Sequence, residues 1–102
     1  MASPQIEHGY TRIAHELLEH LIIKISDINY LRIMLYIIRY TYGFHKKITI
    51  TNYSTMAGAL NLTEEELKTI LTQMEFLGLI LYTKDGKQCV LGIEKNYDQW
   101  TI

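Results

Sequence analysis

Apolar residues recur at helical spacing near the start of the chain. Ile13, Leu17, Leu18, Leu21 and Ile22 fall on one face of a helix that we expect over residues 11–24. The polar stretch before it, residues 1–8, is expected to form an N-terminal extension outside the core.

A second, more apolar helix is expected from a cap at Ser26 or Asp27 to about residue 42. Its broad apolar surface indicates a central place in the fold. Gly43 is expected to end it, and Arg39 suits the negative end of its dipole. The apolar stripe is Ile28, Leu31, Leu35, Ile38 and Tyr42, widened by Ile33, Met34 and Ile37, and the solvent-facing strip is Asn29, Arg32, Tyr36 and Arg39.

The next segment predicts a short strand and two short helices. Residues 48–50 are β-branched, and Thr51 is expected to cap the first of these helices. Asn61 suits a left-handed turn, after which Thr63 and Glu66 form a capping box that opens the second helix. The first helix is expected to bury Tyr53, Met56, Ala57 and Leu60, and the second to bury Leu67, Ile70, Leu71, Met74 and Leu77 before it ends at Gly78.

The last third of the chain predicts a β-hairpin. Residues 79–84 and 87–94 have strand character and are joined by Asp85-Gly86, a typical two-residue turn. Two helices, a helix-turn-helix and a hairpin predict a mostly α, winged helix-turn-helix domain, which we assign to residues 9–94. Residues 95–102 are expected to form a C-terminal tail that leads towards a further region.

Composition agrees with one folded domain. The 102 residues are 48% hydrophobic and 21% charged, which allows a core and argues against disorder. Ten Lys and Arg against eleven Asp and Glu give a net charge of -1, so any contact with DNA must depend on local charge. Cys89 is the single cysteine, which excludes an internal disulfide and favours a reducing compartment.

Two longer motifs stand out. The first is GYTRI at residues 9–13 followed by ELL at residues 16–18, and the second is RYTYGFHKK at residues 39–47. With a weaker match over residues 48–62 and the ending KNYDQW at residues 95–100, they resemble the phage replication protein O family in its N-terminal domain.

The resemblance implies a winged-helix domain that binds repeats of a phage origin in double-stranded DNA, in the cytoplasm of a bacterial host. It also implies that a separate C-terminal region, absent here, recruits the host helicase or its loader. The chain departs from the family at His15, where Asn is usual, and at Thr63-Glu64-Glu65-Glu66, where the family is typically basic. Such acidic side chains repel phosphates.

The helix over residues 63–77 is expected to enter the major groove with the face opposite its apolar stripe. On or beside that face lie Lys68, Thr69, Thr72 and Gln73, which can contact base edges or phosphates. The alternative is that its glutamates form a solvated first turn and the lysines elsewhere serve solubility. The expected phosphate contacts are the wing residues Lys84 and Lys87, the pair Lys46 and Lys47, and Asn52 and Ser54 at the start of the preceding helix.

Phe76 falls on the polar face of that helix, where it either packs against local structure or contacts a partner. With the apolar segment around Trp100, it supports a second hypothesis, a winged helix used for protein contact in self-association or primosome docking. A homodimer would also suit repeated origin sites. A small transcriptional regulator is a third hypothesis, which no motif supports.

The sequence does not indicate catalysis, and we expect a non-enzymatic protein without a cofactor. His15 and His20 imitate a zinc-protease motif, but they are spaced i, i+5 where the motif needs i, i+4, so no metal is expected. The longest apolar run, residues 33–38, is too short to span a bilayer, so no membrane partner is expected.

Overall fold

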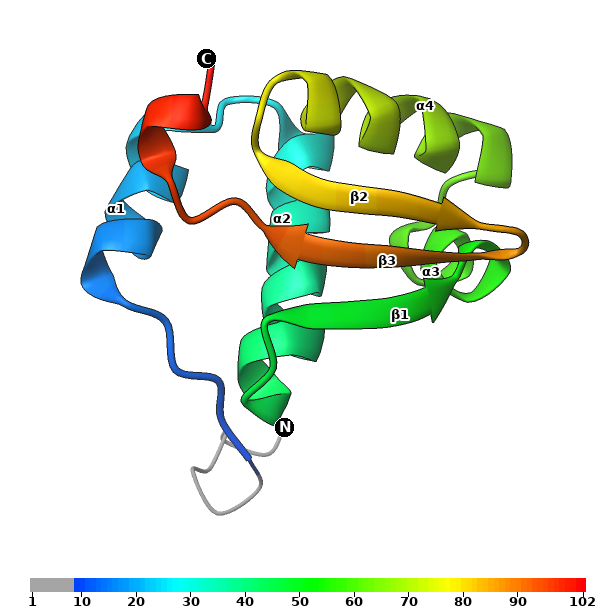
Figure 1. Ribbon diagram of the computed structural model, residues 1–102, viewed down its shortest axis with the longest axis horizontal. Helices are drawn as coiled ribbons and strands as arrows, with labels where there is room; N and C mark the ends of the chain where they lie inside the picture. Colours follow the sequence, from blue (N-terminus) through cyan, green and yellow to red (C-terminus); the bar gives the residue numbers. More distant parts are fainter. Residues whose placement is uncertain (1–8) are drawn as a thin grey trace, which may run out of the picture.

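The computed structural model describes residues 9–102, and the expected N-terminal extension, residues 1–8, lies outside them. The described part is a mostly α winged helix with a β-hairpin, as the sequence predicts (Figure 1). Its elements are α1 (His15–Lys24), α2 (Ile28–Thr41), the 3₁₀ turn η2 (Tyr42–Phe44), β1 (Ile48–Asn52), α3 (Tyr53–Leu60), α4 (Glu64–Phe76), β2 (Ile80–Asp85), β3 (Gln88–Ile93) and the 3₁₀ turn η3 (Tyr97–Gln99).

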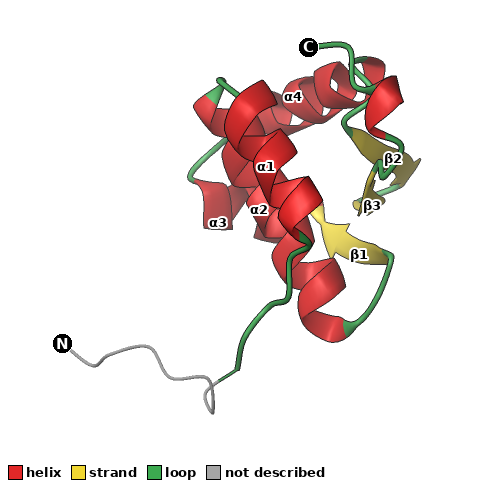
Figure 2. Cartoon of the chain, turned by 90° about the vertical axis from the view of Figure 1, so that its left-hand side faces the viewer, coloured by secondary structure: helices red, strands yellow, loops and turns green. Residues whose placement is uncertain are grey.

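The three strands form one antiparallel sheet in the order β1-β3-β2. The return strand of the hairpin is therefore central, and β1 pairs with it from Ile48↔Gly92 to Asn52↔Gln88. The helices gather on one side of this sheet, with α1 at the edge of the domain farthest from the wing tip (Figures 1 and 2). This arrangement puts α3, α4 and the wing tip at one end of the molecule.

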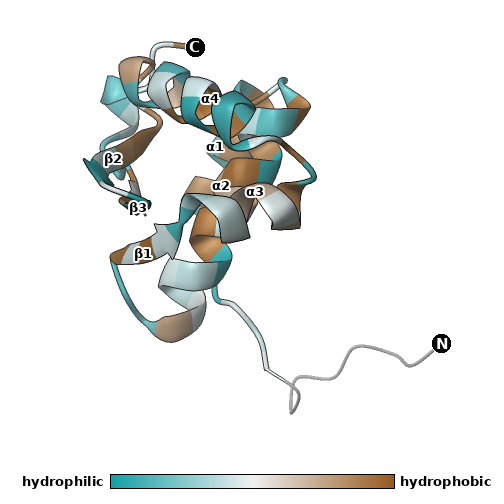
Figure 3. Ribbon diagram, turned by 90° about the vertical axis from the view of Figure 1, so that its right-hand side faces the viewer, coloured by the Kyte–Doolittle hydropathy of each residue, from teal (hydrophilic) through white to brown (hydrophobic). Residues whose placement is uncertain are grey.

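The buried face of α2 is rotated from the expected one. Ile33, Met34 and Ile37 are fully buried, whereas Ile28 is 65% exposed and Leu35 is 44% exposed. The residues that were expected only to widen the stripe therefore form its centre. Figure 3 shows the hydrophobic colour on α2 beneath the more hydrophilic α4.

The expected solvent-facing strip of α2 is also partly covered, because α3 and β1 pack beside it. The Arg32 guanidinium donates a hydrogen bond of 2.7 Å to the carbonyl oxygen of Leu60 at the end of α3. The hydroxyl groups of Tyr36 and Thr51 lie 3.4 Å apart. Long-range neighbours of this kind cannot be inferred from helical periodicity.

The first helix begins four residues later than expected, at His15, and buries a narrower face. Leu17 and Leu21 are buried, whereas Leu18 and Ile22 are exposed. The position of α1 at the edge of the fold explains this, since only one row of its side chains meets the core.

Local signals at the helix ends are mostly confirmed. The Asp27 carboxylate caps α2, and the capping box of Thr63 and Glu66 opens α4. Asn61 has a φ of 57°, left-handed as expected, and Gly78, which was expected to end the helix, has a φ of 76°. The two short helices bury their predicted faces, with Ile70 and Leu77 half-buried at the rim of the second.

Three other local expectations are wrong by one or two residues. Asn52, not Thr51, caps α3, and His45, not Gly43, carries the left-handed conformation after α2 and η2. In the hairpin, Asp85 pairs with Gln88, so the loop residues are Gly86 and Lys87. The strand therefore extends one residue further than the Asp-Gly pair indicated.

The C-terminal segment folds back onto the domain. The Thr101 amide donates to the carbonyl oxygen of Leu77 at 2.9 Å, and the Trp100 indole N–H donates to that of Glu94 at 2.9 Å. Trp100 is only 6% exposed and meets the rings of Tyr97 and His20. The interface role expected for Trp100 is therefore replaced by a role in the core.

Candidate nucleic-acid interface

The helix-turn-helix is built by local backbone bonds between α3 and α4. Asn61 reverses the chain, and the Leu62 amide donates to the carbonyl oxygen of Ala57 at 2.9 Å. The apolar side of α4 is buried at Leu67, Leu71 and Met74. The opposite side of α4 is therefore held outward at a fixed angle to α3.

This outward side contains most of the α4 residues expected to face DNA. Thr69, Thr72 and Gln73 are exposed. The Thr72 hydroxyl donates to the carbonyl oxygen of Lys68 within the helix at 2.9 Å, and the Gln73 amide oxygen accepts from the Tyr30 hydroxyl at 3.2 Å. The Gln73 bond uses the amide oxygen and leaves the NH₂ group for an external acceptor.

Lys68 points elsewhere. It is half-buried, and its ammonium lies 4.9 Å from the centroid of the Tyr53 ring at the start of α3. This cation–π contact directs Lys68 towards the wing side of the helix-turn-helix. Lys68 thus flanks the outward face on its wing side, one helical turn before Thr72.

Tyr53 connects this end of the domain. Its ring lies under the Lys68 ammonium, and its amide donates to the carbonyl oxygen of Lys87 at 3.1 Å. Its hydroxyl lies 2.8 Å from the Tyr82 hydroxyl, and both groups are buried. Burial, followed by the bond from Tyr53, raises the pKa of Tyr82 well above its ordinary value.

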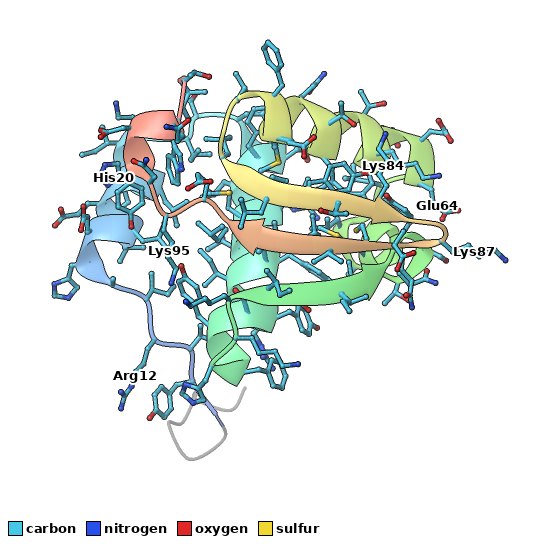
Figure 4. The ribbon with its side chains drawn as sticks, viewed as in Figure 1. Arg12, His20, Glu64, Lys84, Lys87 and Lys95 are labelled. Carbon is cyan, nitrogen blue, oxygen red and sulfur yellow. The ribbon has the colours of Figure 1, made fainter. Side chains whose placement is uncertain are left out.

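Lys68 therefore lies over the first residue of α3, and Lys84 and Lys87 flank the wing turn at the same end of the molecule. Figure 4 shows Lys84 and Lys87 at the wing end of the molecule, with Lys87 extending past the tip. We call these three lysines, with Asn52 and Ser54, the wing-end patch. It lies beside the acidic first turn of α4, whose Glu64 Figure 4 shows between Lys84 and Lys87.

The α3 N-terminus is less open to an anion than expected. The Asn52 side-chain oxygen accepts from the amides of Ser54 at 2.8 Å and Thr55 at 3.3 Å. These donors are therefore used in the cap, whereas the side chain of Ser54 is exposed. Of the two polar residues, Ser54 keeps the better position for phosphate.

The three glutamates at the start of α4 do not have equal roles. The Glu66 carboxylate accepts from the Thr63 amide at 2.9 Å, and the Glu66 amide donates to the Thr63 hydroxyl at 3.1 Å. Hydrogen bonds from the backbone and then the side chain of Thr63 lower the pKa of Glu66. Glu66 thus serves the helix start while it stays ionised, and Glu64 and Glu65 have no such role in the capping box.

Lys46 and Lys47 do not join the wing-end patch. They precede Ile48, whereas the patch begins at Asn52, the other end of β1. A strand of this length spans roughly 17 Å. The four lysines expected to act together therefore form two separate groups.

Phe76, the last residue of α4, is 87% exposed and so is not covered by local structure. It borders a shallow, open hollow of about 420 Å³ with Tyr30, Thr72, Gln73 and Leu77. This surface adjoins the outward face of α4 at the end away from the wing.

Two other observations concern possible chemistry in the described residues. Within residues 9–102, His, Cys, Asp and Glu do not form a group of three or more that could hold a metal ion. His20 stacks on Tyr97, and its Nδ1 lies 2.8 Å from the carbonyl oxygen of Glu16.

In the same residues, the helices are too short or too polar to cross a membrane.

The fold and the outward face of α4 define a winged helix-turn-helix protein. The family model described as bacteriophage replication protein O matches residues 3–100, and the chain belongs to this family, as the motifs at residues 9–18 and 39–47 indicated. The DNA replication protein gp18 of Salmonella phage P22 is 28% identical over 96 residues, which cover 94% of this chain and 34% of that protein. The chain spans about one third of this relative's length. Membership of the bacteriophage replication protein O family supports a role in phage DNA replication.

Proposed function

We propose that this chain binds double-stranded DNA and recognises repeats in a phage replication origin, without catalysis of its own. In this proposal α4 lies in the major groove, as the second helix of a helix-turn-helix does. Thr69, Thr72 and Gln73 contact base edges, and the wing-end patch contacts phosphates. Recruitment of the host helicase or its loader is assigned to a separate region of such proteins.

The observation that carries the proposal is that Lys68, Lys84 and Lys87 belong to the same end of the domain, where the Lys68 ammonium lies over the Tyr53 ring and the Tyr53 amide bonds the carbonyl oxygen of Lys87 in the wing turn. The net charge of the chain is -1, so a polyanion is attracted only where cations gather locally. This gathering lies next to the uncovered face of α4, which is where a winged helix meets DNA. Two such domains on adjacent repeats would offset a modest affinity of each one.

The test is a fluorescence anisotropy titration at low and moderate salt. The duplexes tile the replication region of the phage, and a scrambled duplex of equal length and composition is the control. Saturable binding to one repeat that resists salt better than the scrambled duplex supports the proposal. Equal, salt-sensitive binding to every duplex contradicts origin recognition, and absence of binding at low salt contradicts DNA binding altogether.

A second candidate function, contact with protein, is favoured by the 87% exposure of Phe76. Ile22 and Ile23 on α1 are also more than 70% exposed, so several large apolar side chains face solvent. If Phe76 lies in a homodimer interface, Phe76→Ser shifts a concentration-dependent dimer to monomer in sedimentation velocity. A sedimentation coefficient that does not change with concentration or substitution contradicts this function.

A further inference from the structure

The motif at residues 39–47 has no part in the proposed duplex interface, yet it forms an exposed row of rings. Tyr36, Tyr40 and Phe44 follow one another at helical spacing from α2 into η2. The ring centroids of Tyr36 and Tyr40 are 4.7 Å apart, and those of Tyr40 and Phe44 are 6.2 Å apart with planes within 13°. Tyr40 is 40% exposed and Phe44 is 52% exposed, so this row meets solvent.

Two cations accompany these rings. The Arg39 guanidinium carbon lies 5.3 Å from the Tyr40 centroid and 5.2 Å from the Phe44 centroid. The Lys46 ammonium lies 5.9 Å from the Phe44 centroid. We call Tyr36, Tyr40, Phe44, Arg39 and Lys46 the aromatic–cation patch.

Gly43 gives Arg39 its place in this patch. A Cβ atom at residue 43 would lie 3.0 Å from an Arg39 guanidinium nitrogen and 3.1 Å from the Thr11 hydroxyl. Beside them, a hollow of about 310 Å³ is lined by Arg39, Gly43, Phe44 and residues 9–11. The glycine of the motif is therefore explained by the close approach of a charged side chain rather than by a helix stop.

The local charge favours a polyanion. From Ile28 to Thr63 the sequence contains Arg32, Arg39, Lys46 and Lys47 and no Asp or Glu. Exposed rings beside such cations can stack on nucleobases while the cations bind phosphates. In a duplex the base faces are hidden by neighbouring base pairs, so partly exposed rings such as those of Tyr40 and Phe44 suit unpaired bases.

We propose that the aromatic–cation patch binds single-stranded DNA, with bases stacked on Tyr40 and Phe44 and phosphates bound by Arg39 and Lys46. The patch lies at the C-terminal end of α2, away from the wing end where Lys84 and Lys87 lie (Figures 1 and 4). One molecule can then hold a duplex at one end and an unpaired strand at the other. This site does not depend on duplex binding by α4.

The test measures binding of the whole chain to a fluorescent oligothymidylate, to an abasic oligonucleotide of equal length, and to a duplex. The variants are Tyr40→Ala and Phe44→Ala, and Leu18→Ala is the control because it truncates a large exposed apolar side chain on α1, away from the patch. Stacking on one ring predicts that Phe44→Ala weakens oligothymidylate binding by roughly 5- to 100-fold. Phe44→Trp retains binding, and circular dichroism melts establish that each variant is folded.

The measurement with the duplex distinguishes the proposed single-strand site from the proposed binding of origin duplex by α4 and the wing-end patch. Loss of oligothymidylate binding in Tyr40→Ala and Phe44→Ala, with unchanged duplex binding by both variants and unchanged oligothymidylate binding by Leu18→Ala, supports the patch. Equal binding to the abasic strand contradicts base stacking. Absence of oligothymidylate binding at low salt contradicts the site and leaves these rings to a protein partner.

Discussion

The hydroxyl groups of Tyr53 and Tyr82 form a buried hydrogen bond of 2.8 Å that links the first residue of α3 to the wing strand β2. In Tyr53→Phe the Tyr82 hydroxyl loses its partner in a buried site, which costs about 1–3 kcal/mol of unfolding free energy. Urea denaturation measures this loss. A double-mutant cycle with Tyr82→Phe is expected to recover part of it, and strictly additive losses would contradict the coupling.

The same link matters for the site, because Tyr53 also contacts Lys68 and the backbone of Lys87. Tyr53 therefore links α4 to the wing through both its side chain and its backbone amide.

Gly78 and Gly58 are expected to respond to alanine in opposite directions. Gly78 has a φ of 76°, and a Cβ atom there would collide with the carbonyl oxygen of Gln99. Gly78→Ala should therefore lower the unfolding free energy by more than about 1 kcal/mol. Gly58 lies within α3 with open space around it, so Gly58→Ala should raise stability by about 0.5–1 kcal/mol. If the melting temperatures of both variants shift in the same direction, these backbone assignments are contradicted.

The acidic start of α4 is expected to divide into two functions. Glu64→Gln combined with Glu65→Gln removes charge that faces DNA, so duplex affinity should rise on the order of 3- to 10-fold at low salt. Glu66→Ala also removes a charge, but it breaks the capping box and should therefore lower the melting temperature as well. Anisotropy and thermal melts on both variants check this, and an unchanged melting temperature of Glu66→Ala would refute the division.

Cys89 predicts a loss of stability at alkaline pH. Burial raises the pKa of the Cys89 thiol from 9.0 to about 11. The native state therefore holds its proton more tightly than the unfolded chain, and this contribution is complete below pH 9 and falls as the pH rises towards 11. The expected loss is about 1–3 kcal/mol. The urea midpoint of unfolding should fall more steeply between pH 9 and 11 for the native chain than for Cys89→Ala. Parallel plots of midpoint against pH for the two proteins would contradict the raised pKa of Cys89.

The sequence predicted those features that depend on neighbouring residues. The cap at Asp27, the capping box of Thr63 and Glu66, and the left-handed Asn61 are each set within one turn, and each is confirmed. The two short helices of the helix-turn-helix were also predicted correctly, because their apolar spacing has a single interpretation.

Features that depend on distant partners were not predictable in this way. The rotation of α2 follows from α3 and β1, which cover Arg32 and Tyr36. Lys68 turns towards Tyr53, and Trp100 enters the core through a bond to Glu94. The aromatic–cation patch was not predicted, because helical spacing alone does not show that the Tyr40 and Phe44 rings are exposed beside Arg39 and Lys46.

The central claim is that the wing end, rather than the far end of β1, binds duplex phosphates. The most direct measurement compares the salt dependence of origin-duplex binding for the native chain, Lys84→Glu with Lys87→Glu, and Lys46→Glu with Lys47→Glu. The account predicts that the wing variant binds more weakly, with a salt slope shallower by about two, and that the other pair leaves duplex binding nearly unchanged. Unchanged affinity and slope in the wing variant, or an equal loss in both, would contradict it.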